Sequence, residues 1–132
     1  MMITYKIDDK VEPQELSEVF RRSGIKRPHE DLARMRTMID NADVIVSARS
    51  EGRLVGIARA ITDYAYCCYL SDLAVDAEFQ KKRIGDRLVA ALREHLGDEV
   101  SLVLLSAPGA VDFYPKIGFE KSDRAFVIPR KS

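Results

Sequence analysis

The stretch from Tyr66 to Ser106 reads YCCYLSDLAVDAEFQKKRIGDRLVAALREHLGDEVSLVLLS. Residues 66–75 have the pattern of an extended strand, whereas the apolar residues of 84–96 recur at helical spacing until Gly97. Residues 101–106 then contain the uninterrupted apolar run Leu-Val-Leu-Leu. A strand, a helix and a second strand in this order predict a right-handed parallel βαβ unit. Because the last segment is apolar on both faces, we expect it to be a covered strand inside the sheet.

The segments before this unit predict two helices and a set of antiparallel strands. Residues 3–7 alternate as in a short strand, and residues 13–23 carry apolar side chains at helical spacing. A second helix with a narrow apolar face is expected from about residue 27 to residue 40. Residues 44–61 predict a hairpin that turns at Ser50-Glu51-Gly52-Arg53. Its two strands and the strand at 66–75 are consecutive, which favours antiparallel pairing.

The segments after the unit predict a short helix over residues 110–116, a break at Gly118 and extended chain near Phe119 and over residues 125–128. The fold class that follows is α/β (α+β), with a mixed central sheet and helices on both faces. Its N-terminal half is antiparallel and its second half contains the parallel βαβ unit. A length of 132 residues is short for two cores, so residues 1–132 are expected to form a single domain.

The composition narrows the classes of partner. Twenty-one basic residues balance twenty-one acidic ones, which argues against binding to nucleic acid or to an anionic membrane surface through a general positive field. The first residues lack the basic and apolar regions of a secretory signal, so a cytoplasmic location is expected. Only two cysteines, Cys67 and Cys68, and two histidines, His29 and His95, are present, and their spacing predicts no metal site. Neighbouring cysteines on a strand point to opposite faces, so both are expected to be reduced.

Residues 80–86, Gln-Lys-Lys-Arg-Ile-Gly-Asp, lie after a predicted strand and at the start of the strongest predicted helix. Free backbone N–H groups and the positive end of the helix dipole favour an anion there. A basic patch in a loop is solvated about as often as it binds an anion, so the residues alone leave open whether this segment binds phosphate or is only exposed to water. The segment lacks both the phosphate-loop pattern of nucleotide hydrolases and the three-glycine pattern of nicotinamide-binding proteins.

At this segment the chain resembles the GNAT superfamily of acetyltransferases. The family loop reads Gln/Arg-x-x-Gly-x-Gly/Ala between the fourth strand and the third helix; Gln80 and Gly85 match it, and Arg83 departs from it. The resemblance implies that the loop amides bind the pyrophosphate of coenzyme A. It also implies that the preceding strand, Tyr69 to Val75, binds the pantetheine arm through its backbone.

A second resemblance to the same family covers residues 110–119, AVDFYPKIGF, which are similar to the signature Ala-x-x-Phe-Tyr-x-Lys-x-Gly-Phe. Ala107 stands where many members carry an asparagine beside the coenzyme arm, and Ser106 is the candidate to replace its hydrogen bond. The residues that the resemblance assigns to coenzyme binding are Leu73, Ala74, Val75, Gln80, Lys81, Lys82, Arg83, Ile84, Gly85, Asp86, Ser106, Phe113 and Lys116.

The resemblance implies an N-acetyltransferase that moves an acetyl group from acetyl-CoA to a primary amine by direct attack in a ternary complex. Tyr114 is the implied general acid for the leaving thiolate, and Asp72 is a candidate either for the base or for a residue that orients the substrate. The expected acceptor is a small-molecule or protein amine, and the expected assembly is a monomer or a homodimer. Two alternatives remain open: an acyl-enzyme on Cys68, and a non-catalytic module that binds coenzyme A or another protein.

Overall fold

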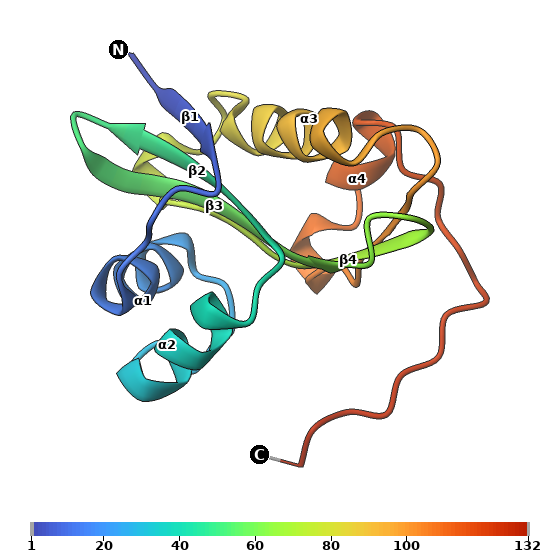
Figure 1. Ribbon diagram of the computed structural model, residues 1–132, viewed down its shortest axis with the longest axis horizontal. Coiled ribbons are helices and arrows are strands. Elements are labelled where there is room, and N and C mark those ends of the chain that lie inside the picture. Colours follow the sequence, from blue (N-terminus) through green and yellow to red (C-terminus); the bar gives the residue numbers. More distant parts are fainter. Residues whose placement is uncertain (1, 132) are drawn as a thin grey trace.

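The computed structural model describes residues 2–131, which contain one five-stranded sheet, four α-helices and two short 3-10 helices (Figure 1). The strands are β1 (Thr4–Ile7), β2 (Val44–Ser50), β3 (Arg53–Thr62), β4 (Cys67–Val75) and β5 (Ser101–Val103). The α-helices are α1 (Pro13–Ser23), α2 (Leu32–Asp40), α3 (Ile84–Leu96) and α4 (Phe113–Lys116), and the 3-10 helices are Ala77–Phe79 and Pro108–Ala110.

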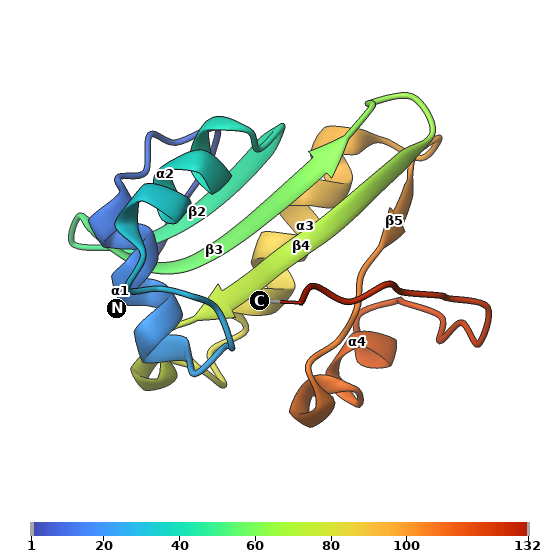
Figure 2. The ribbon, with the colours of Figure 1, turned by 90° about the horizontal axis from the view of Figure 1, so that it is seen from below.

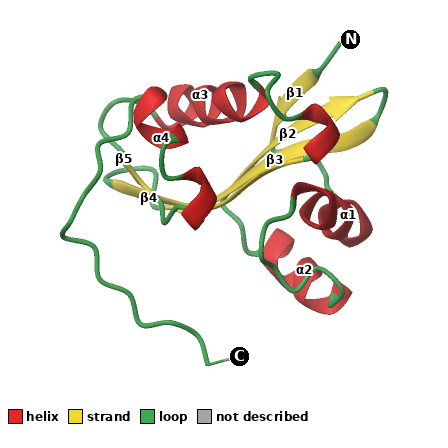
Figure 3. Cartoon of the chain, turned by 180° about the vertical axis from the view of Figure 1, so that it is seen from behind, coloured by secondary structure: helices red, strands yellow, loops and turns green. Residues whose placement is uncertain are grey.

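The sheet is mixed, as the sequence predicts. Its strand order is β1-β2-β3-β4-β5, with antiparallel pairing from β1 to β4 and parallel pairing between β4 and β5. Helix α3 connects the two parallel strands and lies on one face of the sheet, while α1 and α2 cover the other face (Figures 1 and 3). The predicted βαβ unit and the helices on both faces are therefore confirmed.

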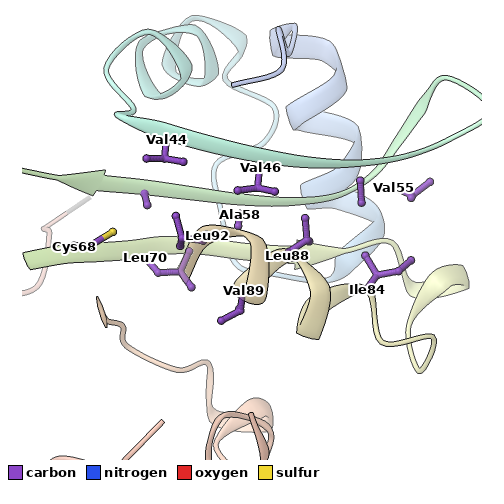
Figure 4. Close-up of a cluster of buried hydrophobic side chains, with 12 residues drawn as sticks. Val44, Val46, Val55, Ala58, Cys68, Leu70, Ile84, Leu88, Val89 and Leu92 are labelled. Carbon is purple, nitrogen blue, oxygen red and sulfur yellow. The ribbon is translucent and has the colours of Figure 1, made fainter. Parts of the chain in front are cut away.

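Two apolar clusters fix these layers. On the α3 face, Leu88, Val89 and Leu92 pack against valines and alanines of β2 and β3 and against the N-terminal half of β4 (Figure 4). On the opposite face, Phe20 of α1 and Met35 of α2 are fully buried against the sheet. Gly56 of β3 allows α3 to approach, because a Cβ there would lie 3.1 Å from Ile84 and 3.2 Å from Leu88.

Helix α2 begins later than the sequence pattern predicts. Residues 24–31 form a loop, and the helix starts at Leu32 because the side chain of Asp31 accepts a hydrogen bond from the backbone N–H of Arg34. A proline at position 28 gives the preceding residue little tendency to be helical, which is consistent with this late start. The loop that results carries Arg27, whose contacts are described below.

The last strand differs most from expectation. The apolar run at residues 101–106 does not form a covered interior strand; β5 has only three residues and lies at the edge of the sheet, with Val103 and Leu105 half exposed. The expected extended segments near Phe119 and at 125–128 form no strand. Apolar side chains on both faces therefore did not show whether this strand lies inside the sheet or at its edge.

Candidate functional site

The strands β4 and β5 separate after Tyr69, the third residue of β4. Their parallel register ends at Tyr69 opposite Val103, so within residues 2–131 no strand lies beside residues 70–75 of β4 on that side (Figure 2). On its other side, β4 remains paired with β3, and the register shift near Arg59 leaves Ser71 as the extra residue of a bulge. The backbone at Leu73 to Val75 is thus available at an open strand edge, which can hydrogen-bond an extended ligand.

The loop that follows β4 leads into the N-terminus of α3 and has an unusual backbone. Lys81 (φ +67°) and Arg83 (φ +64°, ψ +20°) both lie in the left-handed region, which L-residues seldom adopt. Gln80 fastens the loop to the strand, because its side-chain amide donates to the Val75 carbonyl over 2.9 Å. Alternation of right- and left-handed residues makes a concavity of backbone N–H groups suited to an anion.

The side chains at the start of α3 divide into those that point to solvent and those that do not. Lys81 and Lys82 are exposed, whereas Ile84 is buried in the core, so only its backbone can reach a ligand. Arg83 is N-cap of the helix, and its guanidinium lies 2.9 Å from the carboxylate of Asp86. The second carboxylate oxygen of Asp86 is buried and has no hydrogen-bond partner within residues 2–131.

Gly85 connects this helix to the C-terminal part of the chain. A Cβ at this position would lie 3.3 Å from the ring of Phe113 and 4.0 Å from Leu73. The glycine therefore lets α3, β4 and α4 meet at one point. This contact gives the matched Gly85 a packing role in addition to the one that the sequence suggests.

Tyr114 is partly buried between two aromatic rings. Its ring packs edge to face with Phe113 (5.1 Å between centroids) and with Phe119 (5.4 Å). Burial raises the pKa of the phenol above its usual value, and the positive charge of Arg27 partly opposes this rise. The hydroxyl makes no hydrogen bond to any residue from 2 to 131, so it is available to a ligand. At neutral pH it keeps its proton.

Asp72 is held by two arginines. Its carboxylate is fully buried and accepts hydrogen bonds from Nε of Arg27, over 2.5 Å, and from Nε of Arg59. Arg27 also donates a hydrogen bond to the backbone carbonyl of Ser71, and Arg59 donates one to the Ser71 hydroxyl. Both guanidinium groups therefore bind the bulge of β4. One carboxylate faces two cations, which leaves a net positive charge beside Tyr114.

Sequence reasoning missed both arginines. Arg59 carried a usable signal, because it is a charged residue between two alanines in an otherwise apolar strand, and such a residue usually has a buried counter-charge. The sequence around Arg27 gives no comparable signal, because Arg27 lies in a loop and its partner Asp72 is 45 positions away. The loop is also tied down by Ser17 of α1, whose hydroxyl donates to the carbonyl of His29 over 2.5 Å.

The other candidate residues follow β5, end α4 or lie at the start of β4. Ser106 follows β5, and its hydroxyl donates to the Ala107 carbonyl over 2.7 Å. Lys116 ends α4 and is exposed. Cys68 points into the core on the α3 face, and burial raises the pKa of its thiol, whereas Cys67 is exposed. The two cysteines thus face opposite sides of β4, as predicted.

The backbone of Arg83 yields a stability prediction. Because φ is +64°, replacing Arg83 with glycine should relieve a left-handed strain of about 1 kcal/mol, while Arg83→Ala retains it. Both variants lose the ion pair with Asp86, so their difference isolates the backbone. Denaturant unfolding should therefore find Arg83→Gly more stable than Arg83→Ala. Equal stability, or a more stable alanine variant, would show that position 83 is not left-handed in solution.

Residues 2–131 contain neither a helix that could span a membrane nor a cluster of metal-binding side chains. No helix in this part of the chain has both the length and the apolar character needed to span a bilayer. The same residues contain no group of three or more histidine, cysteine, aspartate or glutamate side chains arranged to hold a metal ion.

Comparison with known proteins points to one family. Residues 9–128 match the family model described as an acetyltransferase (GNAT) domain. An uncharacterized N-acetyltransferase of Pyropia yezoensis is 31% identical over 103 residues, which are 74% of this chain and 58% of that longer protein. A GNAT family acetyltransferase of Streptococcus pneumoniae superposes with a TM-score of 0.74 at 21% identity, covering 99% of this chain and 100% of that one.

A further structure with the same fold is an aminoglycoside acetyltransferase in complex with a bisubstrate analogue of coenzyme A and acetylneamine. It superposes with a TM-score of 0.73 at 15% identity and covers 100% of both chains. At this identity it supports the fold alone. The family match extends from Asp9 to Ile128 and so includes the separated strands, the loop before α3 and the α4 segment. The chain therefore belongs to the GNAT family of acetyltransferases.

Proposed function

We propose that the protein transfers the acetyl group of acetyl-CoA to a primary amine by direct attack in a ternary complex. The observation that carries the proposal is the separation of β4 from β5 beside the N-terminus of α3. Family membership supports acetyl transfer in general, and the bisubstrate complex of the aminoglycoside enzyme supports coenzyme A and an amine as the two ligands of this fold. The acceptor remains either a small-molecule amine or an amine of a protein.

The residues of the loop and strand suit coenzyme A in two parts. The first residues of α3 have backbone N–H groups without an acceptor inside the helix: Ile84, Gly85 and Asp86. Together with Lys81 and Lys82, these N–H groups would hold the pyrophosphate. The open edge of β4 at 73–75 would hydrogen-bond the amides of the pantetheine arm. Gln80 and Arg83 would act by shaping the loop. Phe113, Ser106 and Lys116 would border the arm on the side of α4.

Acetyl-CoA supplies an activated acetyl thioester, and the chain would supply orientation and a proton. Backbone N–H groups near Leu73 to Val75 would stabilise charge on the carbonyl oxygen. Tyr114, protonated at neutral pH and without an internal hydrogen bond, would donate its proton to the sulfur of the departing thiolate. The nearby charge of Arg27 would stabilise the phenolate that this transfer leaves, which makes the proton easier to release.

For Asp72 we favour a role in positioning Arg27 over the two roles considered from the sequence, the base and the residue that orients the substrate. Both of its oxygens already accept hydrogen bonds from Arg27 and Arg59, and the residue is buried, so the carboxylate is not presented to an acceptor amine. The carboxylate would instead fix Arg27 beside Tyr114 and stiffen the β4 bulge. The acceptor would then lose its proton to water or enter as the neutral amine.

The covalent alternative on Cys68 has little support. A nucleophilic cysteine must be a thiolate within reach of the substrate. Cys68 is 1% exposed, burial raises the pKa of its thiol, and among the described residues no hydrogen bond joins it to a histidine. Direct attack by the amine therefore remains the better account.

Ligand binding should be visible as added stability. Acetyl-CoA at about 100 times its dissociation constant should raise the free energy of unfolding by roughly 2.7 kcal/mol, because it binds the folded chain only. Thermal unfolding with acetyl-CoA, coenzyme A and ATP measures this, with ATP as the control for simple phosphate binding. If neither acetyl-CoA nor coenzyme A changes the melting temperature, the proposed function loses its basis.

A thiol-release assay over a panel of amines then separates the enzyme from the non-catalytic alternative. The panel should contain monoamines, polyamines, an aminoglycoside and a peptide with a free amine. Turnover on at least one amine supports the enzyme and identifies the acceptor class. Tight acetyl-CoA binding without turnover on any of them favours a module that binds coenzyme A and does no chemistry.

A further inference from the structure

Arg27 binds the open part of β4. It belongs to the connection between α1 and α2, and its guanidinium donates to the carboxylate of Asp72 and to the backbone carbonyl of Ser71. Figure 2 shows this connection beside the C-terminal end of β4. Burial raises the pKa of Tyr114 and the charge of Arg27 partly opposes this rise, so the guanidinium lies within electrostatic reach of the phenol. Arg27 is therefore part of the opening at which the acetyl group would be transferred.

The Arg27 guanidinium has unused hydrogen-bond donors. Of its five N–H groups, three donate within residues 2–131: one to Asp72, one to Ser71 and one to the backbone carbonyl of Lys26. One N–H on each terminal nitrogen therefore has no acceptor in this part of the chain. The Arg27 side chain is 28% exposed, whereas that of Arg59, the other partner of Asp72, is 8% exposed. Of the two arginines, Arg27 is thus the one that a ligand can reach.

The charges around Arg27 do not cancel. Asp72 carries one negative charge and pairs with two guanidinium groups. Lys26, the neighbour of Arg27, is an exposed cation. The acidic residues of the same connection, Glu30 and Asp31, follow at its α2 end, where the Asp31 carboxylate caps that helix. The β4 side of the opening therefore has a net positive charge, and charges interact more strongly where water is partly excluded.

This charge discriminates among acceptor amines. A polyamine or an aminoglycoside keeps other positive charges after one amine has lost its proton, and Arg27 would repel them. An amine that also carries a carboxylate or a phosphate would place an oxyanion on the free N–H groups of the guanidinium, and hydrogen bonds of this kind are strong and directional. The same positive charge lowers the pKa of a nearby ammonium group, which favours the neutral amine that attacks the thioester.

We propose that the acceptor is a small amine with an oxyanion on the same molecule, a carboxylate or a phosphate, which binds the free N–H groups of Arg27. This inference rests on the proposed acetyl transfer and narrows its acceptor class. Asp72 and Ser71 hold the guanidinium at the bulge of β4, and Arg59 holds Asp72 from the buried side. The recognition group is therefore fixed before the acceptor arrives, and binding of the oxyanion directs the amine toward the thioester.

Substrates that differ only in charge test this on the parent protein. Aminoalkanoates of increasing length, from glycine upward, are compared with the matching amides and diamines in the thiol-release assay. Values of kcat/KM are calculated per neutral amine, because the amine pKa differs among these compounds. The best aminoalkanoate should exceed its amide by about 10- to 100-fold, as expected for a charge-assisted hydrogen bond, and the diamine should lie below the amide. Aminoalkyl phosphates form a further arm, which distinguishes a phosphate from a carboxylate.

Variants of Arg27 show whether the preference comes from its guanidinium. Arg27→Gln should bring the kcat/KM of the oxyanion substrate close to that of its amide, and Arg27→Lys, which keeps the charge without the planar fork, should retain part of the preference. Lys26→Gln is the matched control, because it removes the adjacent exposed cation and should leave the preference unchanged. Both substrates are assayed on the same preparation, so a loss of stability or of general activity in a variant does not alter their ratio.

The outcomes separate this inference from the proposed function. Turnover without a preference for the oxyanion at any chain length would overturn the acceptor class and leave acetyl transfer intact. A preference that survives in Arg27→Gln would do the same, and so would turnover on amines outside this series alone. If neither this series nor the broader amine panel contains a substrate, the proposed acetyl transfer fails and the acceptor class fails with it.

Discussion

Replacing Tyr114 with phenylalanine is expected to lower the turnover rate by roughly 100- to 10,000-fold while folding and acetyl-CoA affinity are retained. The ring packs between Phe113 and Phe119, and the substitution keeps both contacts. The hydroxyl has no hydrogen-bond partner among the described residues, so its loss leaves no buried group unpaired and should hardly change stability. The effect should therefore appear in catalysis alone.

The measurement is the maximal rate of thiol release at saturating amine over a series of pH values. The acid must be protonated, so activity should decline as pH rises through the pKa of Tyr114, which burial places above the usual phenol value of 10.0. This alkaline decline should be absent from Tyr114→Phe. Tyr66→Phe is the matched control, because Tyr66 is 77% exposed and lies on the β3–β4 connection. Full turnover of Tyr114→Phe would assign the proton transfer to water or to the amine.

Asp72→Asn is expected to have the largest effect on stability, a loss of about 3–5 kcal/mol in the free energy of unfolding. The substitution removes the carboxylate that pairs with both Arg27 and Arg59, and the Arg59 side chain is 8% exposed. Without Asp72, the buried guanidinium of Arg59 would be shielded from water and have no counter-ion, which lowers the stability of the folded state. Glu18→Gln is the control, since it removes an ion pair with Arg21 on the exposed face of α1 and should leave stability nearly unchanged.

A double-mutant cycle shows where the loss comes from. In an Arg59→Met background the buried cation is gone, so Asp72→Asn should cost much less than in the parent chain. Chemical denaturation of the parent, the two single variants and the double variant gives the coupling free energy between Asp72 and Arg59. A cost for Asp72→Asn below about 1 kcal/mol in the parent would contradict a buried, doubly paired carboxylate.

Kinetics on the folded Asp72→Asn protein distinguish an orienting residue from a base. If Asp72 removed the ammonium proton, its loss would be rescued at high pH, where the amine is already neutral. If Asp72 holds Arg27 and the bulge of β4 in place, the deficit should persist at every pH. We expect the second result. Arg27→Gln should then share part of the same deficit, because it breaks the same contact.

The sequence by itself determined the elements with the strongest periodicity. The first and last apolar residues of the helical pattern, Ile84 and Leu96, are the first and last residues of α3. The glycine in the turn at 50–53 predicted the hairpin of β2 and β3. The loop at 80–86 and the signature at 110–119 were sufficient to identify the family, and both lie at the opening between β4 and β5. These signals are local, since each depends on residues a few positions apart.

Tertiary structure decided everything that depends on distant residues meeting. Whether the run at 101–106 is central or at an edge depends on what lies beside it, and the residues of the run are the same in both cases. The counter-ions of Asp72 come from positions 27 and 59, and their arrangement weakens its candidacy as a base. Gly85 matched the motif as a phosphate-binding residue, yet the absence of a side chain there also lets Phe113 of α4 and Leu73 of β4 approach α3. Charge pairing and close packing act through space, so the sequence could nominate these residues but could not assign their partners.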